Sequence, residues 1–414
     1  MAAARLCAVL LPLCASVAAV RGLFRGGTGD YRRQVSMELN PGANGSVGLD
    51  LLHVRAVGPG DTLHWVLGSQ GPPALLLVHT DSPNSSLTVD WPRLLSRNSS
   101  GSLKVEPQSS VRYASALLFR RIWEYDDTND TADPTHAPPS SFLPPYELDQ
   151  FSWDDLNRTL NRSSLSAQLC GRPSSSSSAS ADTFQNGSLC LEFSAFDSWG
   201  RSSAWPRLLH SANTSQLRVL IKGVAVRSNH SRLVLELAAV VPRDQPSRVD
   251  TLHSIDDEYS PTIFQVCQWV TLSPGSSSAA LGFSQWKPVG YRSEKLLTEF
   301  ATPARHSAPE PRPAPARPSL ARAFFGEQLG EGYQVSGLNL TFGIAGEPFY
   351  NSTQYLSWTV LVGVGSPPWD SFSVLVLSIM AVALGTPALL LLLGGVCVCV
   401  KRKGRAPPQY EPIN

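Results

Sequence analysis

The stretch Val374–Val400, VLVLSIMAVALGTPALLLLLGGVCVCV, contains no charged residue and decides the overall architecture. A helix of this length would extend about 40 Å, whereas the hydrocarbon core of a bilayer is roughly 30 Å thick. The alternative is a helix buried in the core of a soluble protein, but such helices are seldom this long. The sequence therefore predicts one membrane-spanning helix, to which we assign residues 371–400.

The residues after the apolar stretch indicate its orientation. Four basic residues follow directly, at Lys401, Arg402, Lys403 and Arg405, and residues 20–370 carry no such block beside the membrane. Positively charged flanks of a membrane helix remain on the cytosolic side. Residues 401–414 are therefore predicted to form a cytosolic tail.

Residues 1–19 are typical of a secretory signal peptide. Arg5 supplies the basic start, Cys7–Val20 is an uncharged apolar stretch, and small residues near Ala19 offer a cleavage site. The apolar stretch is too short to span a bilayer comfortably, and an uncleaved anchor is the alternative. The two ends together predict a single-pass type I membrane protein with a luminal N-terminus and a cytosolic C-terminus.

Asparagine usage supports this topology independently. The chain has 13 asparagines, and eleven of them begin N-x-Ser/Thr sequons, whereas random placement would give roughly two or three. All eleven lie between the predicted signal peptide and the predicted membrane helix: Asn44, Asn84, Asn98, Asn129, Asn157, Asn161, Asn186, Asn213, Asn229, Asn339 and Asn351. The sequence therefore predicts a densely N-glycosylated luminal ectodomain.

Composition and cysteine usage further restrict the class of protein to which the chain can belong. The net charge of +1 gives no general attraction to nucleic acid, and charged residues make up only 16 % of the chain. Among the seven cysteines, Cys170 and Cys190 could close a loop around a serine-rich segment, which would leave Cys267 free or paired with another chain. With so few cysteines, the ectodomain must be stabilised mainly by apolar burial.

The apolar pattern of the ectodomain predicts a mainly β fold of antiparallel, sandwich-like sheets. Short apolar runs alternate with Pro, Gly, Asn and Ser, as expected for strands and turns. The predicted strands are Gln34–Leu39, Leu51–Val57, Thr62–Leu67, Ala74–Val78, Ser86–Trp91, Val111–Tyr125, Ser188–Phe196, Gln216–Val224, Arg232–Val241, Ile263–Val270, Leu338–Phe342 and Tyr355–Val364. One short helix is expected within Tyr146–Leu160.

Two segments have the composition of linkers or loops. Residues 171–182 are rich in serine, and residues 302–319 are rich in Pro and Ala and should be extended and poorly packed. We therefore expect two β-rich lobes, residues 20–170 and 183–370, joined by the segment 171–182. One continuous β-domain is the alternative.

The sequence offers little that could carry catalysis. The motifs of zinc proteases, serine hydrolases and nucleotide-binding loops are missing, and we expect neither a cofactor nor a metal site. The best candidate is the cluster Asp256, Asp257 and Glu258, which could serve a luminal hydrolase. A loop that caps backbone amides is the favoured explanation for these acids. The eight histidines have no ligand spacing, and we expect ordinary surface residues.

The tail and the predicted membrane helix carry two interaction motifs. Tyr410 and Ile413 fit the Tyr-x-x-apolar pattern that clathrin adaptor complexes bind as an extended strand. In the helix, Ala381 and Gly385 form a small-xxx-small pair, and Pro387 would bend the helix just beyond it. These residues would allow a partner helix to approach closely.

Eight stretches of the chain are specific when taken together: Leu51–Gly58 (LLHVRAVG), Pro144–Leu156 (PPYELDQFSWDDL), His253–Pro261 (HSIDDEYSP), Phe283–Tyr291 (FSQWKPVGY), Arg322–Gly326 (RAFFG), Asn339–Gly343 (NLTFG), Tyr355–Pro368 (YLSWTVLVGVGSPP) and Ser378–Gly385 (SIMAVALG). They cover the chain from the first strand to the tail. Together they resemble the glycosylated lysosomal membrane protein family.

This resemblance implies a location and a role. It implies residence in the lysosomal membrane, and a non-enzymatic role as the accessory subunit of a lysosomal major facilitator superfamily transporter that exports dipeptides. Such a subunit would shield the transporter from luminal proteases and hold it in lysosomes. The alternatives are a luminal hydrolase that uses Asp256, Asp257 or Glu258, and a nuclear transcriptional coregulator. The signal peptide, the sequons and the membrane helix all oppose the nuclear alternative.

Overall fold

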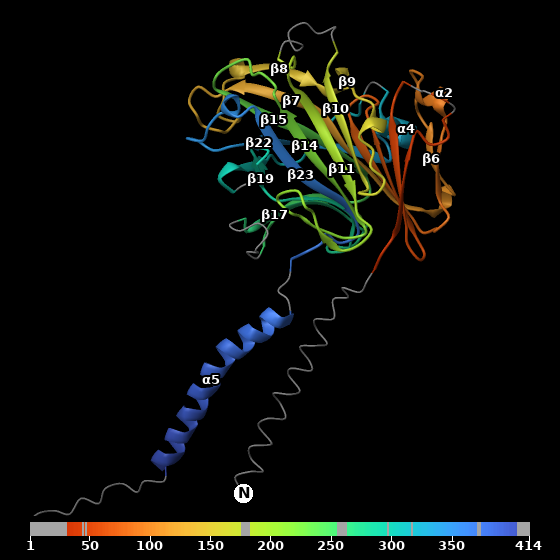
Figure 1. Ribbon diagram of the computed structural model, residues 1–414. Coiled ribbons are helices and arrows are strands. Elements are labelled where there is room, and N and C mark those ends of the chain that lie inside the picture. Colours follow the sequence, from red (N-terminus) through yellow and green to blue (C-terminus); the bar gives the residue numbers. More distant parts are fainter. Residues whose placement is uncertain are drawn as a thin grey trace, which may run out of the picture. The chain divides into compact units, whose positions relative to one another are not determined.

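The computed structural model describes residues 31–43, 45, 48–174, 183–254, 263–295, 298–315, 318–370 and 374–403. The predicted signal peptide, Asn44, the acidic cluster Asp256–Glu258 and the tail motif lie outside these residues. The chain forms two compact units, residues 1–368 and 369–414. The first unit is built mainly from antiparallel strands, which confirms the predicted fold class (Figure 1).

The first sheet contains most of the N-terminal strands. Its neighbouring strands are, in order, β1 (Gln34–Leu39), β2 (Leu51–Val57), β3 (Thr62–Gly68), β4 (Ala74–Thr80), β7 (Val111–Asp126), β15 (Ser231–Pro242) and β22 (Tyr333–Phe342). Three shorter strands extend it: β8 (Phe142–Glu147) pairs with the second half of β7, and β20 (Ala301–His306) and β21 (Glu310–Pro311) pair with β22. Every one of these pairings is antiparallel.

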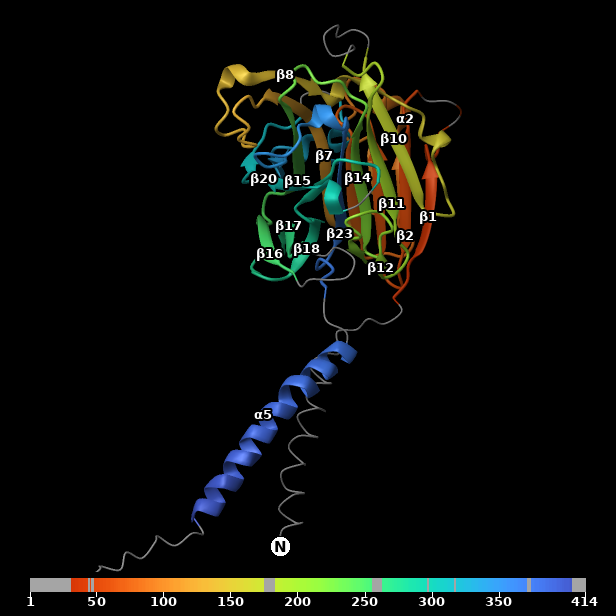
Figure 2. The same cartoon turned by 60° about the vertical axis from the view of Figure 1, so that its left-hand side comes forward.

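The second sheet lies face to face with the first (Figure 2). Its strands are, in order, β16 (Ser247–His253), β17 (Gln265–Leu272), β18 (Ala280–Trp286), β23 (Tyr355–Val364), β14 (Thr214–Lys222), β11 (Ser188–Ala195), β10 (Ser166–Pro173) and β9 (Phe151–Trp153). The short strand β19 (Val289–Tyr291) pairs with both β23 and β20, and so connects the two sheets.

The main hydrophobic core fills the space between the sheets. Successive side chains of a strand point to opposite faces, so alternate residues of β3, such as Leu63 and Trp65, enter this core. Trp286 and Trp358 enter it from the second sheet, with their rings 5.9 Å apart. The core thus depends on aromatic and branched side chains from both halves of the ectodomain.

The outer face of the first sheet is also covered, over part of its area. The covering elements are α2 (Trp91–Leu94), α4 (Leu320–Phe325) and the hairpin of β5 (Ser86–Val89) and β6 (Leu103–Glu106). They pack on a second apolar cluster that includes Val66 and Leu76. Burial on both faces explains why every residue of β3 and β15 is buried.

Two segments near the middle of the first half of the ectodomain differ from the predicted secondary structure. The prediction of a helix within Tyr146–Leu160 is wrong, because this segment contains the end of β8, the strand β9 and two 3₁₀ turns. There Phe151 packs edge-on against Phe184, and the backbone amide of Asp154 donates to the carbonyl of Cys170, so the segment joins the second sheet. In addition, the predicted strand Ser86–Trp91 ends at Val89, because Asp90 caps α2.

The Pro- and Ala-rich segment 302–319 is better packed than expected. It contains most of β20 and all of β21, and both Thr302 and Ala304 are buried. A proline that faces away from its neighbouring strand removes no hydrogen bond, so this composition is compatible with edge strands. The expectation of a poorly packed loop is therefore wrong for residues 302–306.

The described strands on the two sides of residues 171–182 are direct neighbours. β10 reaches into this segment as far as Pro173 and pairs with β11 from Ser166 to Gly171. Leu169 and Leu191, on either side of the segment, lie in the same core cluster as Trp65 and Trp358. In the described residues the two halves of the ectodomain share one core, as in the alternative of a continuous β-domain.

The second unit contains the helix α5 (Val374–Lys403). Residues Ser378–Val398 are long and apolar enough to cross a membrane, and all of them are exposed. The described part of the helix continues through the basic residue Lys403, and the predicted residues 371–373 lie outside the described residues.

Candidate functional site

The predicted glycan acceptors lie mostly on exposed loops and turns of the first unit. Eight sequon asparagines are exposed: Asn84, Asn98, Asn129, Asn157, Asn161, Asn186, Asn229 and Asn351. Asn213 and Asn339 are half-buried, and Asn44 lies outside the described residues. Because an attached glycan is bulky and hydrated, the exposed positions are sterically suited to carry one.

Folding brings two distant sequons together. The side-chain amide of Asn351 donates to Oδ1 of Asn229 over 3.4 Å, although 122 residues separate the two. Asn157 and Asn161 are neighbours in the sequence and are both exposed. Glycans at either of these pairs would cover one continuous area of the ectodomain surface.

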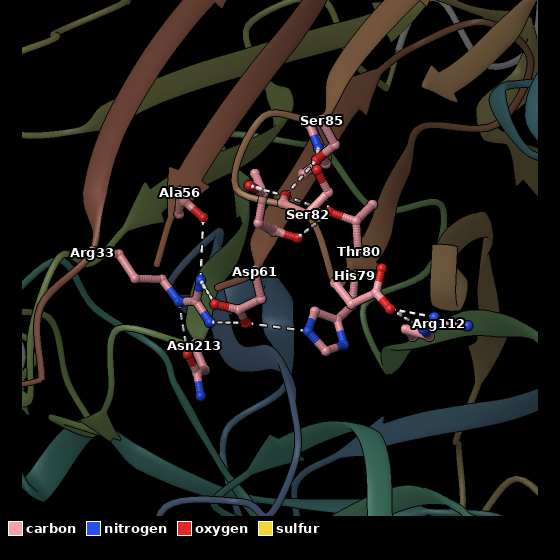
Figure 3. Close-up of polar contacts among 12 residues, drawn as sticks. Arg33, Ala56, Asp61, His79, Thr80, Ser82, Ser85, Arg112 and Asn213 are labelled. Atoms are coloured by element: carbon pink, nitrogen blue, oxygen red, sulfur yellow. Dashed lines mark hydrogen bonds and ion pairs between the residues drawn. The ribbon is translucent and has the colours of Figure 1, made fainter. Parts of the chain in front are cut away.

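Asn213 belongs to a polar cluster that links the two sheets (Figure 3). The guanidinium of Arg33 donates to Oδ1 of Asn213 over 2.9 Å, to both carboxylate oxygens of Asp61, and to the carbonyl of Ala56. His79 contacts Asp61 from the other side, with 3.1 Å between Nε2 and Oδ2. Oδ1 of Asn213 can accept this hydrogen bond whether or not its nitrogen carries a glycan.

The electrostatics of this cluster indicate a structural role. Burial alone would raise the pKa of Asp61, but hydrogen bonds from His79 and Arg33 outweigh it and hold that pKa well below its ordinary value. The carboxylate therefore stays ionised in acid and keeps its hydrogen bonds to Arg33 and His79. A general acid, in contrast, must carry a proton that it can donate. Arg33, Asp61 and His79 form no sequence motif, so nothing in the sequence indicates that they come together.

A second polar group is enclosed on the outer face of the first sheet. His53 of β2 and His64 of β3 stack with nearly parallel rings, and their nitrogens are 3.0 Å apart. His64 Nε2 also lies 2.8 Å from Oγ of Ser85, which contacts Thr80 Oγ1 at 2.7 Å. The expectation of surface histidines is therefore wrong for His53 and His64, which are 6 % and 0 % exposed.

Burial determines the protonation of this histidine pair. It lowers the pKa of His53 to about 4 and the pKa of His64 to about 3, with a further contribution from the positive charge of Arg55. The Ser85–His64 distance would suit a nucleophile and its base. Ser85 is fully buried, however, so a substrate has no access to its hydroxyl in this structure.

The cysteines of the ectodomain have defined positions. Cys170 and Cys190 form a disulfide between directly opposed residues of β10 and β11. Cys267 of β17 is free and buried, and burial raises the pKa of its thiol. This thiol is therefore poorly suited to nucleophilic chemistry.

The remaining candidate residues fall into two groups. Ala381 and Gly385 are one helical turn apart and share a face of α5, and Pro387 lies within the same helix. Asp256, Asp257, Glu258, Tyr410 and Ile413 lie outside the described residues. Within the described ranges, no group of three or more His, Cys, Asp or Glu side chains is arranged to hold a metal ion.

These observations define a class of protein: an antiparallel β-sandwich with sequons over its surface, followed by one helix that could span a membrane. The family profile described as "Glycosylated lysosomal membrane protein" matches residues 50–405. The chain belongs to this family.

Relatives from several vertebrates are similar over nearly their whole length. The chain is 50 % identical over 410 residues to the glycosylated lysosomal membrane protein of Danio rerio, covering 97 % of this chain and 98 % of the relative. The chain is 43 % identical to glycosylated lysosomal membrane protein B of Xenopus laevis, and the alignment covers 97 % of this chain and 96 % of the relative. It is 41 % identical to the glycosylated lysosomal membrane protein of Homo sapiens, and that alignment covers 93 % of this chain and 92 % of the relative.

Proposed function

We propose that this chain is a non-enzymatic accessory subunit of a major facilitator superfamily transporter that exports dipeptides from lysosomes. It would shield the transporter from luminal proteases and keep it in the lysosomal membrane. The observation that carries the proposal is the distribution of ten described sequon asparagines, exposed or half-buried, over one β-sandwich that precedes a single apolar helix. In this arrangement residues 31–368 are luminal and residues 401–414 are cytosolic.

The physical basis of the shielding is steric. A protease must bind an extended segment of its substrate in a cleft, and a bulky hydrated glycan obstructs that approach. Paired acceptors such as Asn229 and Asn351 would place two glycans side by side. A folded domain with a glycan coat can therefore protect short loops of a neighbouring protein that lacks glycans of its own.

The helix and the tail supply the other two parts of the proposal. Ala381 and Gly385 would let α5 pack closely against a transporter helix, since small residues permit close backbone approach in membranes. Tyr410 and Ile413 would then bind clathrin adaptors and direct the pair to lysosomes. A transporter without a sorting signal of its own would depend on this tail.

Deletion of the gene for this chain tests the proposal in cells. We expect the transporter protein to fall several-fold in abundance, and inhibitors of lysosomal proteases to restore it, because the loss is proteolytic. Quantitative immunoblotting and lysosome immunopurification measure both effects. Re-expression of a variant with Asn→Gln at the eight exposed sequons is the matched control, and it should bind the transporter without protecting it. Unchanged transporter abundance and location after deletion would refute the proposal.

A further inference from the structure

A groove of about 640 Å³ lies on the part of the outer face of the first sheet that α2 and α4 leave open. Arg121, Glu236 and Asn339 stand in one row across β7, β15 and β22 and form its floor. Phe142 of β8 and the segment from Pro134 to Pro139 form one wall, and Arg312 with Pro313 forms another.

The groove combines aromatic and charged side chains. The indole nitrogen of Trp123 donates to Oε2 of Glu236 over 3.0 Å, and the guanidinium of Arg121 lies over the Trp123 ring at 5.3 Å. The ring of Phe142 meets the Trp123 ring edge-on. Apolar surfaces beside oriented polar groups are suited to a ligand that has both characters, as a sugar ring does with its C–H face and its hydroxyls.

Three residues that line the groove each have one buried polar atom without a hydrogen-bond partner among the described residues: Nε of Arg121, Nε of Arg312 and Oδ1 of Asn339. Nε of Arg121 is within 3.3 Å of Glu147 Oε1 and 3.4 Å of Glu236 Oε2, without hydrogen-bond geometry. Buried polar groups are nearly always satisfied in folded proteins, so these three residues have hydrogen-bonding capacity beside the groove that the described part of the chain does not use.

We propose that this groove seats the inner sugars of an N-glycan attached to Asn339. Asn339 begins the sequon Asn339-Leu340-Thr341 and itself lines the groove, so the attached sugars are held there at high effective concentration. The acetamido carbonyl and hydroxyl oxygens of N-acetylglucosamine accept from the two arginines, a sugar hydroxyl donates to the acceptors on the floor, and the C–H face packs on the aromatic wall. The inference rests on the luminal placement in the proposed function.

Binding in the groove makes the Asn339 glycan less accessible to enzymes than the glycans on exposed loops. An amidase that releases the whole glycan must reach the bond between the asparagine side chain and the first sugar, and a sugar bound in the groove blocks that approach until it leaves. We expect the enzyme peptide-N-glycosidase, acting on the folded full-length protein in detergent, to release the Asn339 glycan about tenfold more slowly than the glycan on the exposed Asn351. Glycopeptide mass spectrometry at each site measures the release.

Variants separate the groove from the partial burial of Asn339 itself. Trp123→Ala and Arg312→Ala each remove one side chain that lines the groove. Either substitution should make the glycan on Asn339 as easily released as the glycan on Asn351. The matched control is Trp199→Ala, which removes an exposed tryptophan outside the groove and should leave the protection intact. If Trp123→Ala does not fold, Arg312→Ala keeps the test valid. The ion pair of Arg312 with Glu310 in the described residues is long, at 3.5 Å.

Four results would overturn the inference. They are an unmodified Asn339, equal release at Asn339 and Asn351 in the unmutated protein, protection that persists in both groove variants, and protection that needs a co-expressed transporter. The last would assign the groove to a partner loop. An unmodified Asn339 with glycans at the other sequons leaves the proposed function intact, whereas a chain without any glycan would refute both.

Discussion

Replacing Glu124 by glutamine is expected to lower the free energy of unfolding by about 3–5 kcal/mol. The carboxylate of Glu124 is fully buried and has four hydrogen bonds. Oε1 accepts from the backbone amide of Arg227 and from the Ser231 hydroxyl, both at 2.6 Å. Oε2 accepts from Nε of Arg227 at 2.7 Å and from the Tyr146 hydroxyl at 3.0 Å.

Glutamine has nearly the same shape but cannot satisfy these donors. Its amide nitrogen would face either the Arg227 amide and Ser231, or the Arg227 guanidinium and Tyr146, and the arginine would lose its buried counter-charge. Urea unfolding monitored by tryptophan fluorescence measures the change. The control is Glu294→Gln, which removes the ion pair with Lys222 between two well-exposed side chains and should have little effect. A similarly small effect for Glu124→Gln would show that the buried network is not a main support of the fold.

The second large effect is a loss of stability in acid that depends on His53 and His64. Their folded-state pKa values of about 4 and 3 lie below the ordinary value of about 6.5. Between pH 6.5 and pH 4 the unfolded chain therefore binds protons that the folded chain does not, and the stability falls as the pH falls. At pH 5 each histidine lowers the free energy of unfolding by about 2 kcal/mol relative to neutral pH.

The double variant His53→Gln/His64→Gln tests this prediction, because it removes both titrating groups and keeps polar side chains in place. The difference in unfolding free energy between pH 7.5 and pH 5 should shrink by about 4 kcal/mol relative to the unmutated chain. Asp61, with its lowered pKa, loses its contribution only at lower pH, so it does not enter this window. His136→Gln changes an exposed histidine and serves as the control. An unchanged pH dependence in the double variant would contradict the buried, neutral state of the pair.

The sequence predicted the elements whose pattern is local. Strands such as Leu51–Val57 and Tyr355–Val364 have the predicted bounds, because a short apolar run between turn residues is a local signal. The strands β10, β16 and β18 were not predicted, since their alternating polar residues dilute that signal. Their strand conformation is imposed by neighbours in the sheet, which lie elsewhere in the chain.

The polar clusters could not be predicted, because their members are far apart in the sequence. Arg33 and Asn213 are separated by 180 residues, and Glu124 and Arg227 by 103. The sequons are the opposite case, since each acceptor is defined by three consecutive residues. The groove beside Asn339 combines both kinds of information: the acceptor is visible in the sequence, and the surrounding side chains come together only in the fold.

Co-purification of the full-length chain from lysosomal membranes in mild detergent, followed by mass spectrometry, tests whether the chain is bound to a transporter. We expect one major facilitator superfamily transporter to be recovered in near-stoichiometric amount. Ala381→Leu/Gly385→Leu should reduce this recovery by blocking close helix packing, whereas Ala383→Leu, on another face of α5, should not. Recovery of the chain without any transporter, or with soluble hydrolases alone, would refute the proposed role as an accessory subunit.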